Sequence, residues 1–224
     1  MEENREEPRP HLGASLLGHP CDRYLWLSFR WAVFEKFEGR MLRLFRRGQR
    51  EEYSIVEDLR SIGIEIHSTG GEQSRVDFGS HVSGSIDGII EGGVPEAPKK
   101  RHIAEFKTHN EKSFKDLISK GVKESKPRHW CQMQVYMLGT GIDRALYVAI
   151  NKNDDTYYAE RVRFDKEAAQ ALVDRGHRIA LSDRLPEPLS ADPTWWQCKF
   201  CPCYEFCHKT HLTREINCRT CAHA

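Results

Sequence analysis

The stretch GSIDGIIEGGVPEAPKKRHIAEFKT, residues 84–108, places charged side chains in two short apolar strands separated by a Gly- and Pro-rich loop. Asp87 belongs to the first strand, and Glu105 and Lys107 belong to the second. Because side chains alternate across a strand, Glu105 and Lys107 project from the same face. Core strands rarely bury charges without a reason, so these three residues are candidates for a functional site.

A divalent cation would explain the three charges. If the Asp87 strand pairs with the Glu105 strand, two carboxylates meet, and they repel each other unless a cation lies between them. Oxygen ligands suit Mg²⁺ or Mn²⁺, and such an ion polarises a phosphate and activates water, which Lys107 can position or help to deprotonate. The pattern therefore indicates phosphodiester hydrolysis. The alternative is an ordinary Glu–Lys pair on a surface strand, which is common and contributes little.

The composition is typical of a soluble, globular protein. The chain has 224 residues, of which 39% are hydrophobic and 30% are charged. No apolar run approaches the ~20 residues that span a bilayer. The N-terminal MEENREEPRPH lacks the apolar segment of an export signal, so we expect a cytoplasmic protein with no membrane partner. With a net charge of +1, any nucleic-acid surface must be a local patch.

Hydrophobic patterning indicates an α/β fold. Helices are expected within residues 12–38 and at 40–61, 129–141 and 165–183. Strands are expected at 62–69, as a pair within 75–91, at 102–110, and as a hairpin at 144–164. We expect three parts: a disordered lead-in at 1–11, a core at 12–190 and a cysteine-rich, metal-binding tail at 191–224.

Six of the eight cysteines follow residue 197. Without an export signal disulfides are not expected, and clustered thiols in a reducing compartment indicate a metal site. A zinc site formed by His208, His211, Cys218 and Cys221 is one possibility for the end of the tail. The alternative is that the last two cysteines are unliganded in a frayed end. Cys131, outside the tail, is interpreted as a small core residue.

Basic and aromatic residues form candidate DNA contacts. One face of the 40–61 helix carries four arginines, and it is either a phosphate-binding face or a solvated one: Arg43, Arg46, Arg47 and Arg50. A basic stretch follows the strand that carries Glu105 and Lys107, and its candidate contacts are Lys112, Lys115 and Arg128. Trp130 and Tyr24 either stack on bases or pack in the core.

Four motifs, taken in order, resemble a known family. RRGQREE, GSIDG, IAEFKT and QMQVY resemble the G-x-x-x-E, D…E-x-K and Q-x-x-x-Y motifs of the PD-(D/E)xK nuclease superfamily, in its RecB-like exonuclease branch. The resemblance implies a restriction-endonuclease-like core, in which helices flank a central mixed sheet. It also implies that Mg²⁺ or Mn²⁺ is held by Asp87, Glu105, the Phe106 carbonyl and Glu52, with Glu51 as the competitor of Glu52.

The same resemblance implies roles for three more residues. Lys107 orients the attacking water and the scissile phosphate. Gln132 and Tyr136 line the site and steady the substrate, although a packing role for Tyr136 is a close alternative.

The segment SLLGHPCDRYLW, with a later C-x₂-C-x₅-C, is similar to the iron–sulfur exonucleases of the CRISPR-adaptation type and their phage relatives. That similarity implies a [4Fe–4S] cluster on Cys21, Cys198, Cys201 and Cys207. Cys203 competes with Cys201 or Cys207, and tetrahedral Zn²⁺ on four of these sulfurs is the alternative.

The implied function is a DNA exonuclease that acts on free ends and prefers single strands, in recombination, repair or spacer acquisition. The implied protein partner belongs to recombination or CRISPR adaptation. Two alternatives stay open: a structure-specific endonuclease on the same core, and a non-catalytic, metal-stapled DNA-binding subunit.

Overall fold

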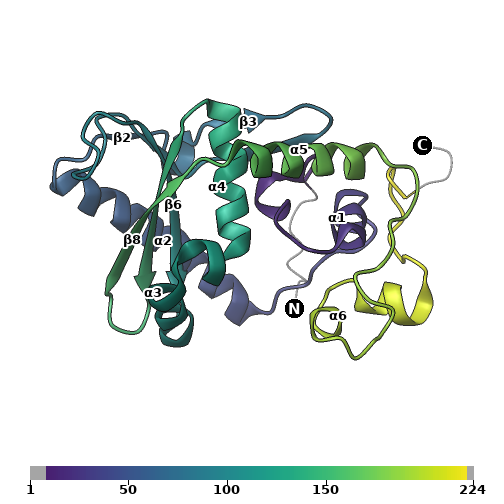
Figure 1. The fold of residues 1–224 in the computed structure, drawn as a ribbon. Coiled ribbons are helices and arrows are strands. Elements are labelled where there is room, and N and C mark those ends of the chain that lie inside the picture. The colour runs from purple at the N-terminus through teal and green to yellow at the C-terminus, as the bar shows by residue number, and fades with distance from the viewer. Residues whose placement is uncertain (1–8, 221–224) are drawn as a thin grey trace.

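The computed structural model describes residues 9–220 (Figure 1). Its strands are β1 (Leu12–Gly13), β2 (Ile66–His67), β3 (Arg75–Asp77), β4 (Val82–Ser85), β5 (Gly88–Ile90), β6 (His102–His109), β7 (Arg144–Asn151) and β8 (Tyr157–Arg163). Its α-helices are α1 (Asp22–Phe29), α2 (Gly39–Ser61), α3 (Glu111–Ser125), α4 (Pro127–Thr140), α5 (Lys166–Leu181) and α6 (Trp196–Lys199). Three short helical turns complete the list: η1 (Ala14–Leu16), η2 (Gly70–Glu72) and η3 (Phe206–Thr210).

A five-stranded mixed sheet in the order β2-β5-β6-β7-β8 forms the centre of the molecule. Strands β6 and β7 are parallel, and the other pairs are antiparallel. On one face, Ile55 and Val56 of α2 pack against Phe106 and Val148. On the other face, α3 and α4 pack over the positions that alternate with these. The predicted α/β architecture, a mixed sheet flanked by helices, is confirmed.

A second sheet, in the order β1-β4-β3, lies beside the first. The sequence predicted two strands within residues 75–91, and the structure has three. The chain leaves the small sheet after Ser85 and enters the large sheet at Gly88, so Asp87 lies in the bend between the two sheets. This position brings the Asp87 side chain to the strand that carries Glu105.

Helix α1 is shorter than the patterning of residues 12–38 suggests. It ends at Phe29, and Trp31 adopts the left-handed conformation, with φ of 55°. The Trp31 indole donates a hydrogen bond of 2.8 Å to the carbonyl of Arg9, and the Arg219 guanidinium lies over its ring. These distant contacts stabilise a conformation that L-residues rarely adopt.

The cysteine-rich tail packs against α1, as the yellow segment of Figure 1 shows. Cys203 forms a small buried cluster with Leu27 and Ala32. Arg219 donates hydrogen bonds of 2.6 Å to the carbonyls of Phe29 and Pro10. No helix within residues 9–220 is long and apolar enough to cross a membrane.

Candidate active site

The ammonium group of Lys107 lies among three oxygens. It donates hydrogen bonds to Oε1 of Glu105 and, over 3.0 Å, to the carbonyl of Phe106, and Oδ2 of Asp87 is 3.7 Å away. The three charges singled out in the sequence therefore meet at one place.

Strand pairing produces this convergence. Gly88 of β5 pairs with Ala104 of β6, so the antiparallel register places Asp87 across from Glu105. The backbone amide of Phe106 donates a hydrogen bond of 2.9 Å to Oδ2 of Asp87. This bond holds the carboxylate of the bend against the central strand.

Glu105 is fully buried, and its second oxygen accepts a hydrogen bond of 3.0 Å from the side-chain amide of Gln132 on α4. Burial raises the pKa of Glu105 to about 8; Lys107 opposes this shift, and the charge of Asp87 reinforces it. Burial therefore makes this carboxyl harder to ionise than an exposed glutamate, and the charge of Lys107 limits that effect.

Lys107 keeps its proton at neutral pH. Burial alone would lower the pKa of this lysine, but the carboxylates of Glu105 and Asp87 outweigh burial and raise it above its usual value. An ammonium held in this way acts through its charge and its hydrogen bonds rather than by accepting a proton.

Glu52, rather than its neighbour Glu51, faces this group. Glu52 borders the same cleft of about 650 Å³ as Asp87 and Lys107, whereas Glu51 pairs with Arg47 over 3.3 Å. Gln73 donates a hydrogen bond of 2.9 Å to Glu52. Burial raises the pKa of Glu52, and the nearby charge of Asp87 adds to that shift.

Tyr136 lies behind the cleft, in the core between α4 and the small sheet. It is 2% exposed, and a Cβ at Gly84 would lie only 2.6 Å from its hydroxyl oxygen. Gly84 is therefore required for this close approach. Burial, together with the charges of Glu105 and Asp87, raises the pKa of Tyr136.

Several residues near the site were missed by the sequence reasoning. Thr108 and Lys152 border the cleft, because Lys152 follows the strand that runs parallel to β6. Tyr147 of β7 pairs with Glu105 in the register, and its hydroxyl contacts two imidazoles, His109 over 2.8 Å and His129 over 2.9 Å.

Both imidazoles are neutral at physiological pH. Burial, with the charges of Lys126 and Lys107, lowers the pKa of His109 to about 4. Burial, with the charge of Lys107, lowers the pKa of His129 to about 3. The two histidines therefore add no positive charge beside Lys107.

The arginine face of α2 points away from the cleft. The cleft is bordered by α2 residues at helical spacing: Met41, Leu44, Phe45, Gly48, Gln49, Glu52 and Ile55. Residues 43, 46, 47 and 50 are exposed on the opposite side of the helix. The predicted arginines are thus not brought to Lys107, although Arg47 reaches the Lys152 carbonyl over 3.1 Å.

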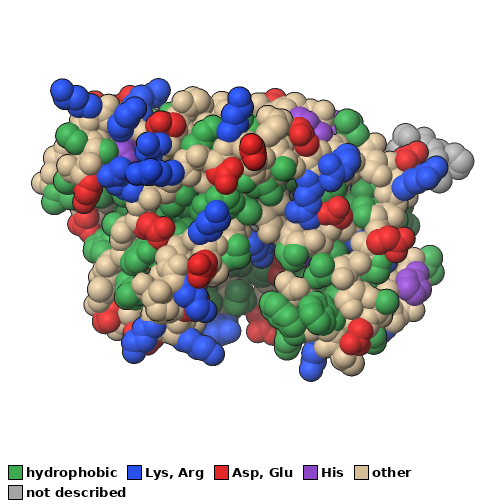
Figure 2. Space-filling model, viewed as in Figure 1, with side chains coloured by type: hydrophobic (Ala, Val, Ile, Leu, Met, Phe, Trp, Pro, Cys, Tyr) green, Lys and Arg blue, Asp and Glu red, His purple; other side chains and the backbone are tan. Residues whose placement is uncertain are grey.

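The second predicted DNA surface lies over α3 and the first turn of α4. Figure 2 shows Lys and Arg side chains gathered over α3, and it shows that the same face of the molecule is hollowed beside them. Lys112 and Arg128 are exposed, whereas Lys115 pairs with Glu111 over 2.6 Å. Trp130 packs partly into the core, and the Lys123 ammonium lies 4.6 Å from its ring centroid.

The structure brings the tail cysteines to Cys21. One small cavity is bordered by seven Cys and His side chains, two from the N-terminal segment and five from the tail: His19, Cys21, Cys198, Cys201, Cys203, Cys207 and His208. Within residues 9–220, no group of three or more His, Cys, Asp or Glu side chains is arranged so that it could hold a metal ion.

The second predicted zinc set is not brought together in the part of the chain that is described. His208 borders the cysteine cavity, whereas His211 and Cys218 are exposed. Cys221 lies outside the described residues. Cys131 packs against the backbone turn at Gly18. A Cβ added at Gly18 would lie only 2.8 Å from the Cβ of Cys131.

Residues 4–208 match the model of the PD-(D/E)XK nuclease superfamily, so the chain belongs to that superfamily. No curated protein matches the chain in sequence.

Solved structures share its fold at low identity. The alkaline exonuclease LHK-Exo from Laribacter hongkongensis has a TM-score of 0.55 and 18% identity, covering 77% of this chain and 87% of its own. The same enzyme in complex with dAMP gives a TM-score of 0.53 and 15% identity over the same shares. SSO0001 has a TM-score of 0.51 and 16% identity, covering 92% of this chain and 89% of its own.

Proposed function

We propose that this chain is a metal-dependent DNA exonuclease that hydrolyses phosphodiester bonds at free ends. The observation that carries the proposal is the set of oxygens around the Lys107 ammonium, from Glu105, Phe106 and Asp87. Oxygen donors directed at one cation are what Mg²⁺ and Mn²⁺ prefer. Membership of a nuclease superfamily whose members generally use divalent ions supports the same reaction class.

In this proposal Asp87, Glu105 and the Phe106 carbonyl hold Mg²⁺ or Mn²⁺, and Glu52 completes the shell. When bound, the ion polarises the scissile phosphate and lowers the pKa of an attacking water. Lys107 remains an ammonium and orients the water and the phosphate. Gln132 is a positioning residue, because it touches the reaction only through Glu105.

The proposal includes a preference for single-stranded DNA, in recombination, repair or spacer acquisition, together with a protein partner from such a pathway. An exonuclease among the fold neighbours supports action at ends. The competing function is a structure-specific endonuclease on the same core.

We also propose that Cys21, Cys198, Cys201 and Cys207 hold a [4Fe–4S] cluster, with Zn²⁺ as the alternative. The support for this proposal is that all four thiols border one cavity, even though the whole core separates Cys21 from the other three in sequence. Two further groups compete for the metal there. Cys203 is buried at the cavity, and the buried Nε2 of His208 has no hydrogen-bond partner within residues 9–220.

The test uses linear and covalently closed circular single-stranded DNA of the same sequence, with Mg²⁺, with Mn²⁺ or with EDTA. We expect degradation of the linear DNA only when a metal is present, an intact circle, and no cleavage by Glu105→Gln. Glu51→Gln is the matched control, because its carboxylate pairs with Arg47 outside the site. Cleavage of the circle would favour the endonuclease, and an absence of metal-dependent cleavage of both forms would refute the proposal.

A further inference from the structure

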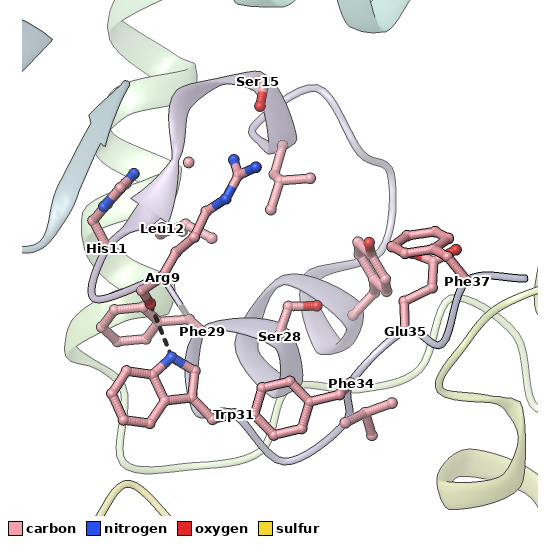
Figure 3. A pocket seen from close by; sticks show the side chains of 14 residues that line it. Arg9, His11, Leu12, Ser15, Ser28, Phe29, Trp31, Phe34, Glu35 and Phe37 are labelled. Atoms are coloured by element: carbon pink, nitrogen blue, oxygen red, sulfur yellow. Dashed lines mark hydrogen bonds between the residues drawn. The ribbon is translucent and has the colours of Figure 1, made fainter. Parts of the chain in front are cut away.

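A second cavity, of about 320 Å³, lies between the N-terminal segment, α1 and the loop that joins α1 to α2. Five of the side chains that border it are aromatic: Tyr24, Phe29, Trp31, Phe34 and Phe37. Figure 3 shows two oppositely charged side chains on opposite sides of this cavity, Arg9 and Glu35. The catalytic proposal uses none of these residues.

This cavity adjoins the catalytic cleft. Arg9 borders both spaces. Phe37, which borders the cavity, packs edge-to-face against Phe45, which borders the cleft, with ring centroids 4.9 Å apart. The two spaces therefore share a wall made of one cation and one pair of aromatic rings.

The chemistry of the cavity fits a nucleobase. Aromatic faces bind any unstacked base, and a volume of this size lies at the lower end of the roughly 300–1,000 Å³ typical of small-molecule sites. The carboxylate of Glu35 disfavours a phosphate inside the cavity, whereas Arg9 at the shared wall attracts one. A base inside the cavity, with its phosphate toward the cleft, keeps the phosphate away from Glu35 and beside Arg9.

We infer that this cavity binds an unstacked base of a single-stranded DNA end while the adjoining phosphate enters the catalytic cleft. The inference rests on the proposed function and deepens it, because it supplies a physical reason for a single-strand preference. A base inside a duplex is paired and stacked, so it does not enter such a cavity without being extruded.

Two aromatic residues suit the test better than the others. The Arg219 guanidinium already lies over Phe29 and Trp31, at 4.3 and 4.2 Å from the ring centroids. Removing those rings would therefore also disturb the attachment of the tail. Phe34 and Phe37 border the cavity and are partly exposed, so they are the positions to change.

Binding is measured by fluorescence anisotropy with a labelled single-stranded oligonucleotide and with versions that carry one abasic residue at successive positions from the end. The Glu105→Gln background prevents cleavage during the titration. One abasic position should weaken binding by about 5- to 150-fold, the range expected for losing one stacked base. The double variant Phe34→Ala, Phe37→Ala should bind intact and abasic strands almost equally.

Tyr157→Ala is the matched control, because this exposed aromatic residue on β8 borders neither space. It should keep the abasic effect. Phe37→Trp retains an aromatic face and should also keep it, which separates stacking from damage to the fold. The inference is overturned if no abasic position weakens binding, or if the effect persists in the double variant.

The two proposals fail in distinguishable ways. Metal-dependent cleavage by the wild type without any abasic effect leaves the proposed function standing and removes the base site. An abasic effect without cleavage of linear DNA keeps the base site and removes the nuclease.

Discussion

The side-chain amide of Gln132 donates a hydrogen bond of 3.0 Å to Oε2 of Glu105. Because Lys107 binds the other oxygen, this bond fixes the orientation of a carboxylate proposed to hold the metal. Gln132→Ala should lower cleavage by about 10- to 100-fold, the usual effect of losing an outer-shell partner. Steady-state cleavage of linear DNA over a range of Mg²⁺ concentrations measures the loss, and unchanged kinetics would contradict the role given to Gln132.

Gln134, two residues away on the same helix, should show the opposite behaviour. Its amide donates to the Arg163 carbonyl over 3.0 Å and accepts from the Asp165 amide over 2.7 Å. Gln134→Ala removes two part-buried hydrogen bonds, so the free energy of unfolding should fall by about 0.5–1.5 kcal/mol for each bond. Urea denaturation measures this loss. Cleavage per folded molecule should be unchanged, and a selective loss of activity would show that Gln134 also serves the site.

Glu105 should make the stability of the metal-free protein depend on pH. The unfolded chain ionises this carboxyl near pH 4.5, whereas burial raises the pKa in the folded protein to about 8. The free energy of unfolding therefore falls as the pH rises through this window. Glu105→Gln removes this titration. As the pH rises from about 5 to about 8, the wild type should therefore lose more stability than the variant.

Urea denaturation in EDTA at about pH 5 and about pH 8 tests this sign. Parallel pH profiles for the two proteins would contradict the raised pKa. Added Mg²⁺ should restore the stability of the wild type most at the higher pH, because the ion binds the ionised carboxylate.

Cys21→Ser should reduce the metal content of the protein and loosen the tail. The thiol borders the same cavity as the tail cysteines, so its loss removes the only one of the proposed ligands that comes from the N-terminal segment. Elemental analysis for iron and zinc, with the visible absorbance of an iron–sulfur cluster, measures the change. Cys131→Ala is the control and should keep full metal content. Equal metal content in Cys21→Ser would exclude Cys21 as a ligand.

Local patterning predicted the elements that depend on neighbouring residues. The helix expected at 40–61 is α2, and the strands expected at 102–110 and within 144–164 are β6, β7 and β8. The end of α1 could not be predicted, because glycine usually marks a left-handed helix terminus and here Trp31 adopts that conformation. Its stabilising contacts come from Arg9 and Arg219, which are distant in sequence.

The candidate site was predictable where it is local in sequence. Glu105 and Lys107 lie two apart on one strand, so alternation alone places them together. Strand pairing brings Lys152 to the cleft, and loop packing brings Gln73 to Glu52. The sequence specifies neither contact. The sequence left the direction of the α2 arginines open between a phosphate-binding face and a solvated one, since only the packed structure shows which helix face meets the sheet.

The most direct test is a Mn²⁺ titration followed by electron paramagnetic resonance. Wild-type protein should bind Mn²⁺, and Asp87→Asn and Glu105→Gln should each weaken binding by more than about 100-fold, beyond the effect of an outer-shell partner. Asn at position 87 retains an acceptor for the Phe106 amide, so the fold should persist. Glu51→Gln should bind like the wild type. If both site variants bind Mn²⁺ as tightly as the wild type, Asp87 and Glu105 do not hold the ion.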